Sequence, residues 1–129
     1  MNSKEVLYLA PETLYRLGNA TSPLLSRMRP DDIDIIDVNG VKMVVANKKG
    51  VSLYNKEGLD LVPLTGWVWE IKAHTNLPFG LKLTKDNEPL GHYTLSPVRN
   101  MSVHEFLGLL DQVAIHCKKI FKSRHKVLK

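Results

Sequence analysis

The sequence predicts an α+β fold in which a long C-terminal helix packs against a strongly bent antiparallel β-sheet. The middle of the chain consists of short runs of alternating apolar and polar residues, separated by Pro, Gly or Asn-Gly. The last segment changes to apolar residues at three- and four-residue steps, which is the stripe of a core-facing helix. With 129 residues, no repeat and no linker, we expect a single domain over 1–129.

The expected strands start with Thr13–Gly18, where alternation puts Arg16 on one face and Tyr15 on the other. The run IDIIDV-NG-VKMVVA, Ile33–Ala46, predicts a hairpin because Asn39-Gly40 favours a turn with positive φ at both central residues. Breaks at Pro or Gly delimit four further predicted strands, at Val51–Asn55, Trp67–Lys72, Leu81–Lys85 and His92–Ser96.

A long helix is predicted after these strands. Ser102, with Glu105 three residues later, forms a capping box at its start. Cys117 is the only cysteine, which excludes an intrachain disulfide and a cysteine zinc site and fits a reducing compartment; on the stripe it should be buried and unreactive. The stripe consists of Val103, Phe106, Leu107, Leu110, Val113, Ala114, Cys117, Ile120 and Phe121.

The net charge of +5 is concentrated at the C-terminus. Residues 118–129 hold six Lys or Arg and no acid, so the remaining chain has 12 basic and 13 acidic residues. We interpret these cations as a solvated helix end that suits the helix dipole, with 123–129 as a basic tail. A neutral body with a basic end supports nucleic-acid binding only weakly.

Targeting and catalytic signatures are missing from the sequence. It has no signal-peptide core and no stretch near the roughly 20 apolar residues of a membrane span, so a cytoplasmic protein is expected. It also lacks phosphate-loop, dinucleotide, zinc and serine-hydrolase motifs. Three polar residues on predicted strands remain as site candidates: Arg16, Ser52 and His92. Taken singly, each also fits a structural role, as an edge arginine, a surface hydroxyl or a half-buried histidine.

Four pieces of the chain resemble a known family. They are TLYR from Thr13, KGVSLYNKEGL from Lys49, LPFGLKL from Leu77 and HYTLSP from His92, followed by Met101 and the striped helix. Their order and spacing, from about Thr13 to about Lys122, resemble bacterial type VI secretion toxins with an ADP-ribosyltransferase-like fold. The resemblance implies a compact split antiparallel sheet of the diphtheria-toxin class, with NAD in a cleft between its halves.

The resemblance also implies an activity: a cytotoxic effector that transfers ADP-ribose from NAD to an unknown macromolecule in the target-cell cytoplasm, or hydrolyses NAD. Catalytic roles fall to Arg16, Ser52 and His92. A guanidinium suits the pyrophosphate of NAD, so Arg16 is also expected to bind the cofactor, together with Arg29, Ser52, His92 and Tyr93. Alternation puts His92 and Tyr93 on opposite faces, and of the two we expect His92 to touch the ligand. No metal is expected.

The catalytic carboxylate and the partners are less well defined. The Gln/Glu-x-Glu pattern of many ADP-ribosyltransferases is missing; Glu105 is a cap, Glu88 lies in the turn DNEP, and Glu70 fits an outward-facing charge. A toxin of this kind implies a neutralising immunity protein. Two alternatives remain: an RNA 2′-phosphotransferase of the same fold, and a non-catalytic basic module that binds nucleic acid along its C-terminal end.

Overall fold

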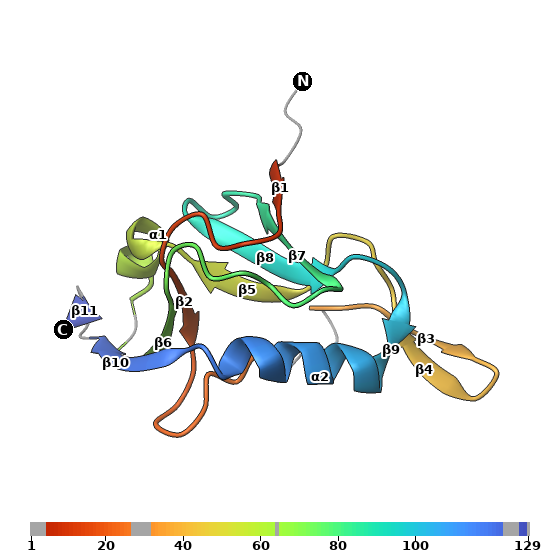
Figure 1. The fold of residues 1–129 in the computed structure, drawn as a ribbon. Helices are drawn as coiled ribbons and strands as arrows, with labels where there is room; N and C mark the ends of the chain where they lie inside the picture. Colours follow the sequence, from red (N-terminus) through yellow and green to blue (C-terminus); the bar gives the residue numbers. More distant parts are fainter. Residues whose placement is uncertain (1–4, 27–31, 64, 123–126, 129) are drawn as a thin grey trace.

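The computed structural model describes residues 5–26, 32–63, 65–122 and 127–128. Within them an eight-stranded antiparallel sheet has the order β1-β7-β8-β5-β2-β6-β10-β11, and a small sheet has the order β3-β4-β9 (Figure 1). The predicted α+β class with an antiparallel sheet is thus confirmed. The strands are β1 (Glu5–Leu7), β2 (Leu14–Leu17), β3 (Ile35–Val38), β4 (Val41–Val44), β5 (Val51–Tyr54), β6 (Gly66–Ile71), β7 (Leu81–Lys85), β8 (His92–Pro97), β9 (Met101–Ser102), β10 (Lys118–Lys122) and β11 (Val127–Leu128), and the helices are α1 (Lys56–Leu61) and α2 (Val103–Ala114).

The large sheet divides between β2 and β5. These two central strands share one register pair, Tyr15 with Tyr54. By contrast, β5 is paired with β8, and β2 with β6, over four residue pairs each. The halves β1-β7-β8-β5 and β2-β6-β10-β11 therefore meet at a narrow seam within one continuous sheet. The split sheet of the diphtheria-toxin class stays a prediction.

The two helices cover opposite faces of the sheet (Figure 1). Helix α2 buries Phe106, Leu110 and Val113 in the main core, which includes Leu14 of β2 and Leu53 of β5. Since successive strand residues face opposite ways, Tyr15 belongs to the other face, where it packs with Leu59 of α1 and Val68. Neither helix in the described part of the chain is long and apolar enough to cross a membrane.

Helix α2 begins at the predicted place, with the serine half of the predicted capping box. The Ser102 hydroxyl accepts a hydrogen bond from the Glu105 amide at 3.0 Å. The Glu105 carboxylate accepts a 2.6 Å hydrogen bond from Arg99. Helix α1 was not predicted, although Asn55 caps it by accepting from the Gly58 amide at 2.9 Å.

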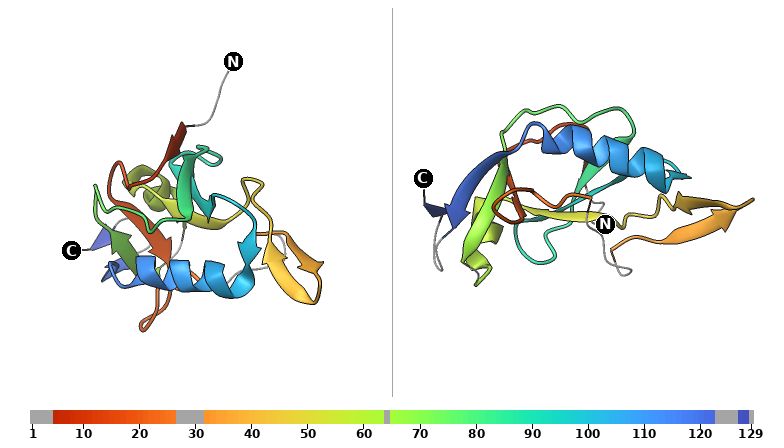
Figure 2. Two further views of the ribbon diagram at one scale, coloured as in Figure 1. Left: turned by 45° about the vertical axis from the view of Figure 1, so that its right-hand side comes forward. Right: turned by 90° about the horizontal axis from the view of Figure 1, so that it is seen from below.

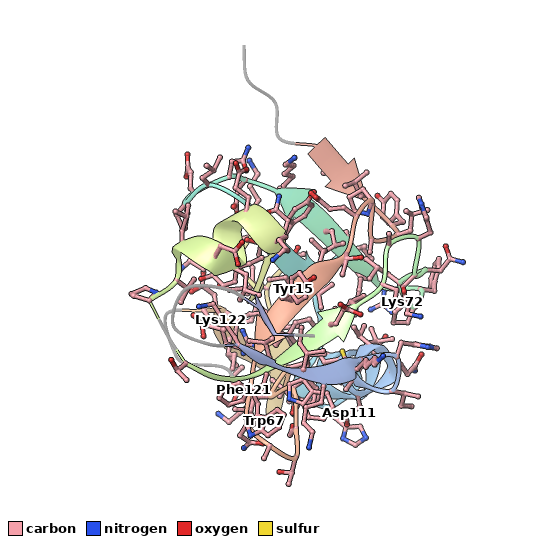
Figure 3. All side chains as sticks on the ribbon, turned by 90° about the vertical axis from the view of Figure 1, so that its left-hand side faces the viewer. Tyr15, Trp67, Lys72, Asp111, Phe121 and Lys122 are labelled. Carbon is pink, nitrogen blue, oxygen red and sulfur yellow. The ribbon has the colours of Figure 1, made fainter. Side chains whose placement is uncertain are left out.

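The prediction that α2 continues through Phe121 is wrong. The helix ends at Ala114, and after a short turn the chain forms β10, which pairs with β6 from Lys118–Glu70 to Lys122–Gly66. This pairing supplies hydrogen-bond partners to the edge of β6, which an extension of the helix could not do. Strand alternation explains the same apolar residues: Ile120 packs against the Tyr15 cluster, while the Phe121 ring contacts Trp67 edge-on at 5.3 Å (Figure 3).

The cations of residues 118–122 therefore do not form a solvated helix end. Lys122 is fully buried, and its ammonium donates to the carbonyl of Val62 at 2.8 Å. Lys119 donates to the carbonyl of Ala20 at 2.8 Å and lies 4.6 Å from the Trp67 ring centre. Lys119 and Lys122, which were predicted to be part of a solvated basic surface, thus make contacts that stabilise the fold. In the predicted tail, 123–126 and 129 lie outside the described residues, whereas Val127–Leu128 pair with β10.

The predicted hairpin is present as β3 and β4. Asn39 and Gly40 have φ angles of 53° and 85°, as the turn requires. The hairpin projects from the body of the protein, and Figure 2 shows its tip far from both helices. Its base joins β9 through the pairs of Met43 with Ser102 and Val44 with Met101.

Candidate functional site

Ser52 and His92 lie side by side on neighbouring strands. In the β5–β8 register Tyr54 is opposite His92 and Ser52 is opposite Thr94, so all four side chains share one face. The Nε2 atom of His92 is 2.9 Å from the Ser52 hydroxyl oxygen, and the Tyr54 ring packs edge-on against the imidazole at 5.3 Å. The structure thus brings together two predicted site residues that are 40 positions apart in the chain.

A third residue, Asp86, joins Ser52 and His92, and it was not among the site residues that the sequence predicted. Its Oδ1 lies 2.6 Å from Nδ1 of His92, and its Oδ2 accepts a hydrogen bond from the Thr94 hydroxyl at 2.6 Å. The aspartate and histidine side chains are only 14% and 11% exposed, so solvent screens their contact weakly. Asp86 could have been found from the hairpin register: Lys85 pairs with Tyr93, so the next residue faces His92.

The Asp86 carboxyl is ionised at neutral pH. Burial alone would raise its pKa, but hydrogen bonds from Thr94 and His92, together with the charge on His92, outweigh burial and hold the pKa below its usual value. A carboxylate therefore backs the imidazole, and the imidazole contacts a hydroxyl. Asp86, His92 and Ser52 thus form a continuous hydrogen-bonded chain.

Arg16 approaches Ser52 from β2, across the seam, but from the other face of the sheet. It is the neighbour of Tyr15, and Tyr15 shares the face of Tyr54, Ser52 and His92, so alternation puts the Arg16 side chain on the opposite face, with Tyr93. Its Nη1 donates to the main-chain carbonyl of Ser52 at 3.0 Å, and its Nη2 donates to the carbonyl of Leu24 at 2.9 Å. The β2–β5 ladder has only the Tyr15–Tyr54 pair, so the guanidinium links the two strands where main-chain pairing has ended. Arg16 is therefore attached to the main chain of Ser52, not to its hydroxyl.

Tyr93 lies on the opposite face of β8 from His92, as alternation predicts. It is 1% exposed within the main core, and its hydroxyl donates to the Glu12 carboxylate at 2.7 Å. The same carboxylate accepts from the Asn55 amide at 3.2 Å. Tyr93 is thus separated from the Ser52–His92 cluster by the sheet itself. Arg29 lies outside the described residues.

Glu70 shares the sheet face of His92. The register pairs Glu70 with Tyr15, Tyr15 with Tyr54, and Tyr54 with His92, which makes one row across four strands. Burial raises the pKa of Tyr15, and the negative charges of Glu70 and Asp60 raise it further. Glu70 is half-buried, which departs from the expected outward-facing charge. Of the three carboxylates that the sequence offered, it is the one in register with the site.

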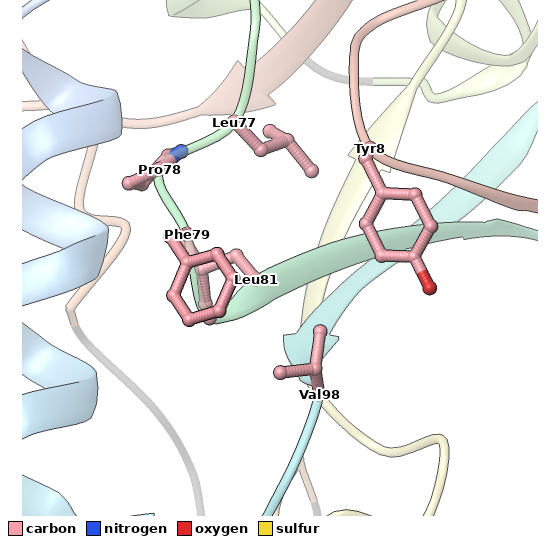
Figure 4. Close-up of a pocket in the computed structure, with 7 residues that line it drawn as sticks. Tyr8, Leu77, Pro78, Phe79, Leu81 and Val98 are labelled. Carbon is pink, nitrogen blue, oxygen red and sulfur yellow. The ribbon is translucent and has the colours of Figure 1, made fainter.

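The cavities described for the protein lie elsewhere. The larger, about 490 Å³, is mostly apolar and open, and Phe79 beside it is 94% exposed (Figure 4). A smaller one of about 100 Å³ lies near Trp67 and Lys122. Neither cavity is lined by Ser52 or His92. The candidate site is therefore identified by the chemistry of its side chains and not by the size of a cavity. Among the described residues no group of three His, Cys, Asp or Glu could hold a metal ion.

The comparison with known families fits this arrangement. The model of the Tse2 ADP-ribosyltransferase toxin family matches residues 12–120, a range that includes the seam, Asp86 and every member of the cluster. The chain belongs to this family. The resemblance inferred from the four sequence pieces is thereby confirmed, as is the general class of ADP-ribosyltransferase toxin. No curated protein and no solved structure matches the chain significantly.

Proposed function

We propose that the protein is an NAD-dependent toxin that transfers ADP-ribose to a macromolecule of a recipient cell, or hydrolyses NAD. Family membership supports the class of reaction. The observation that carries the assignment of a site is the contact between Ser52 Oγ and His92 Nε2, at 2.9 Å, beside the seam of the split sheet.

The chemistry of NAD cleavage explains these residue types. Breaking the nicotinamide–ribose bond builds positive charge on the sugar, so a site must hold the ribose firmly and let the nicotinamide leave. A hydroxyl next to an imidazole can hydrogen-bond sugar hydroxyls, which is the proposed role of Ser52 and His92. A half-buried carboxylate on the same face can stabilise the developing charge, and Glu70 fits this role by register.

Arg16 fits the proposed role of anion binder because a guanidinium can offer parallel N–H groups to a pyrophosphate. Two of its hydrogen bonds go to main-chain carbonyls, those of Ser52 and Leu24, which carry no net charge. An anionic ligand is electrostatically a stronger acceptor than either carbonyl. The pyrophosphate of NAD could therefore replace these two carbonyls as acceptor.

The biological setting is also part of the proposal. A toxin of this family would be delivered by type VI secretion, would act in the cytoplasm of the recipient cell, and would be neutralised in the producing cell by an immunity protein.

The test is NAD consumption by the purified protein, with mass analysis of the products. We expect release of nicotinamide, together with free ADP-ribose or a modified macromolecule from added lysate. Arg16→Ala and His92→Ala should both lose activity and should relieve growth arrest on cytosolic expression. Ile115→Ala, at a position that is 78% exposed beyond α2, is the control that should stay active. Full NAD consumption and full toxicity of both folded site variants would overturn the proposal.

The same assay separates the alternative enzyme. An RNA 2′-phosphotransferase would release nicotinamide only when a 2′-phosphorylated RNA is supplied, and the phosphate would leave the RNA. Nicotinamide release without such an RNA supports the toxin activity.

A further inference from the structure

Asp86, His92 and Ser52 are linked by two hydrogen bonds, and the chemistry of Asp86 decides which atom donates in each of them. A carboxylate only accepts hydrogen bonds, so the 2.6 Å contact to His92 requires a proton on Nδ1. In the neutral ring Nε2 then carries a lone pair, and at 2.9 Å it must accept the hydrogen of the Ser52 hydroxyl.

We propose that Asp86 is a positioning residue, which holds His92 in the Nδ1-protonated tautomer and thereby makes Ser52 the group that the site presents to its ligand. This inference rests on the proposed function, and it assigns a role to a residue outside the predicted set. It also changes the part played by His92. Both ring nitrogens have protein partners, so the imidazole acts on the ligand through the Ser52 oxygen.

The surroundings restrict Asp86 and His92 to this arrangement. Thr94 donates to the second oxygen of Asp86 at 2.6 Å, which prevents the carboxylate from rotating freely. Tyr54 contacts the imidazole edge-on and restricts rotation of the ring. Arg16 fixes the main chain of Ser52 through its carbonyl. Aspartate, imidazole and serine are therefore each held by a separate neighbour, as a preorganised site requires.

The direction of the chain has a chemical consequence. The Ser52 oxygen donates its hydrogen toward Nε2 and keeps its lone pairs for a donor on the ligand, such as a ribose hydroxyl. If the ligand hydroxyl passes its proton to the Ser52 oxygen, the Ser52 hydrogen can move to Nε2; the negative charge is then on the ligand oxygen, and the Asp86 carboxylate stabilises the imidazolium that forms.

The decisive measurement is the tautomer of His92, read from long-range ¹H–¹⁵N correlations of histidine-labelled protein at a pH where the ring is neutral. His92→Ala assigns the signals among the five histidines. We expect Nδ1 to carry the proton in the wild-type protein. In Asp86→Asn we expect the proton to move to Nε2, because an amide N–H can then donate to Nδ1.

Activity is measured on the same proteins. Asp86→Asn should lower kcat for NAD consumption by roughly 10²-fold or more, the scale of a lost acid–base partner, while KM changes less. The matched control is Asp34→Asn: Asp34 also has a lowered pKa, from hydrogen bonds with Lys49 and Asn47, but it lies at the base of the β3–β4 hairpin. It should leave both the tautomer and kcat unchanged.

The outcomes separate the two proposals. A wild-type His92 that carries its proton on Nε2 overturns the positioning role, even if Asp86→Asn fails to fold. The positioning role is also overturned if Asp86→Asn folds and leaves both the His92 tautomer and kcat unchanged. If the wild-type protein consumes no NAD, the proposed function fails, whereas the spectrum still tests the direction of the chain.

Discussion

Replacing Gly91, a buried turn residue directly before His92, should destabilise the protein strongly. Gly91 has a φ of +81°, and a Cβ atom there would lie 2.3 Å from the Asn55 side-chain oxygen and 2.5 Å from the Gly58 amide nitrogen. Those two atoms form the N-cap hydrogen bond of α1. Gly91→Ala therefore strains the backbone and breaks the cap in one change.

The magnitude follows from comparison with Gly40, which has a φ of +85° and nothing within 4 Å of its Cβ position. Gly40→Ala should cost about 1–2 kcal/mol of unfolding free energy, the left-handed strain of alanine alone. Gly91→Ala adds roughly 0.5–2 kcal/mol for the cap and about 1–3 kcal/mol for overpacking. The difference between the two variants should thus be roughly 1.5–5 kcal/mol.

Urea unfolding of both variants measures this difference. With a slope of about 1–3 kcal/mol per molar urea, the midpoint of Gly91→Ala should lie at least roughly 0.5 M below that of Gly40→Ala. Equal midpoints for the two variants would refute the steric argument, because both share the backbone term. Gly91→Ala should also reduce activity at moderate temperature, because Gly91 directly precedes His92 in the chain.

Three further outcomes are expected. Because the pKa of Asp86 is lowered on folding, its ionised form stabilises the protein above the usual value of 3.8, and this advantage over Asp86→Asn should vanish in acid titrations of stability as pH falls through the lowered folded pKa. Lys122→Ala should cost about 1–3 kcal/mol in urea unfolding because the carbonyl of the half-buried Val62 loses a donor. Lys118→Ala, at an exposed position, should change stability by about 0.5 kcal/mol or less, and equal effects would contradict this account. Cys117 is half-buried and not fully buried as predicted, and burial raises the pKa of its thiol to about 11. A thiol reagent should therefore label it at neutral pH much more slowly in the native than in the unfolded protein, and equal labelling rates would disprove this.

Local patterns predicted most of the fold correctly. The strands β2, β5, β6, β7 and β8, the hairpin turn and the start of α2 follow from alternation, turn residues and a cap, each of which depends on a few neighbouring residues. The end of α2 could not be found this way. Its stripe continues in sequence through Phe121, but the pairing of β10 with β6 decides the conformation, and this pairing joins segments about 50 residues apart.

The site was predictable in part for the same reason. Ser52 and His92 stood out as polar residues on apolar strands, and the register then brought them into contact. Asp86 lies in a turn, where an aspartate is ordinary, so its type and position carry no local signal. Only the pairing of Lys85 with Tyr93 reveals that the turn aspartate faces the imidazole.

The contacts of Arg16 connect ligand binding with the integrity of the sheet. The seam between β2 and β5 has one main-chain register pair, and the guanidinium adds bonds to carbonyls on β5 and on the loop after β2. A ligand anion that takes both N–H groups would release those carbonyls and loosen the seam beside Ser52. Arg16→Ala removes the anion binder and the link together, so its loss of activity has two causes. Arg16→Lys separates them, because an ammonium keeps the charge but cannot present a planar fork to two acceptors at once. If anion binding dominates, the lysine variant retains part of its affinity for NAD; if the link dominates, it resembles the alanine variant in both activity and stability.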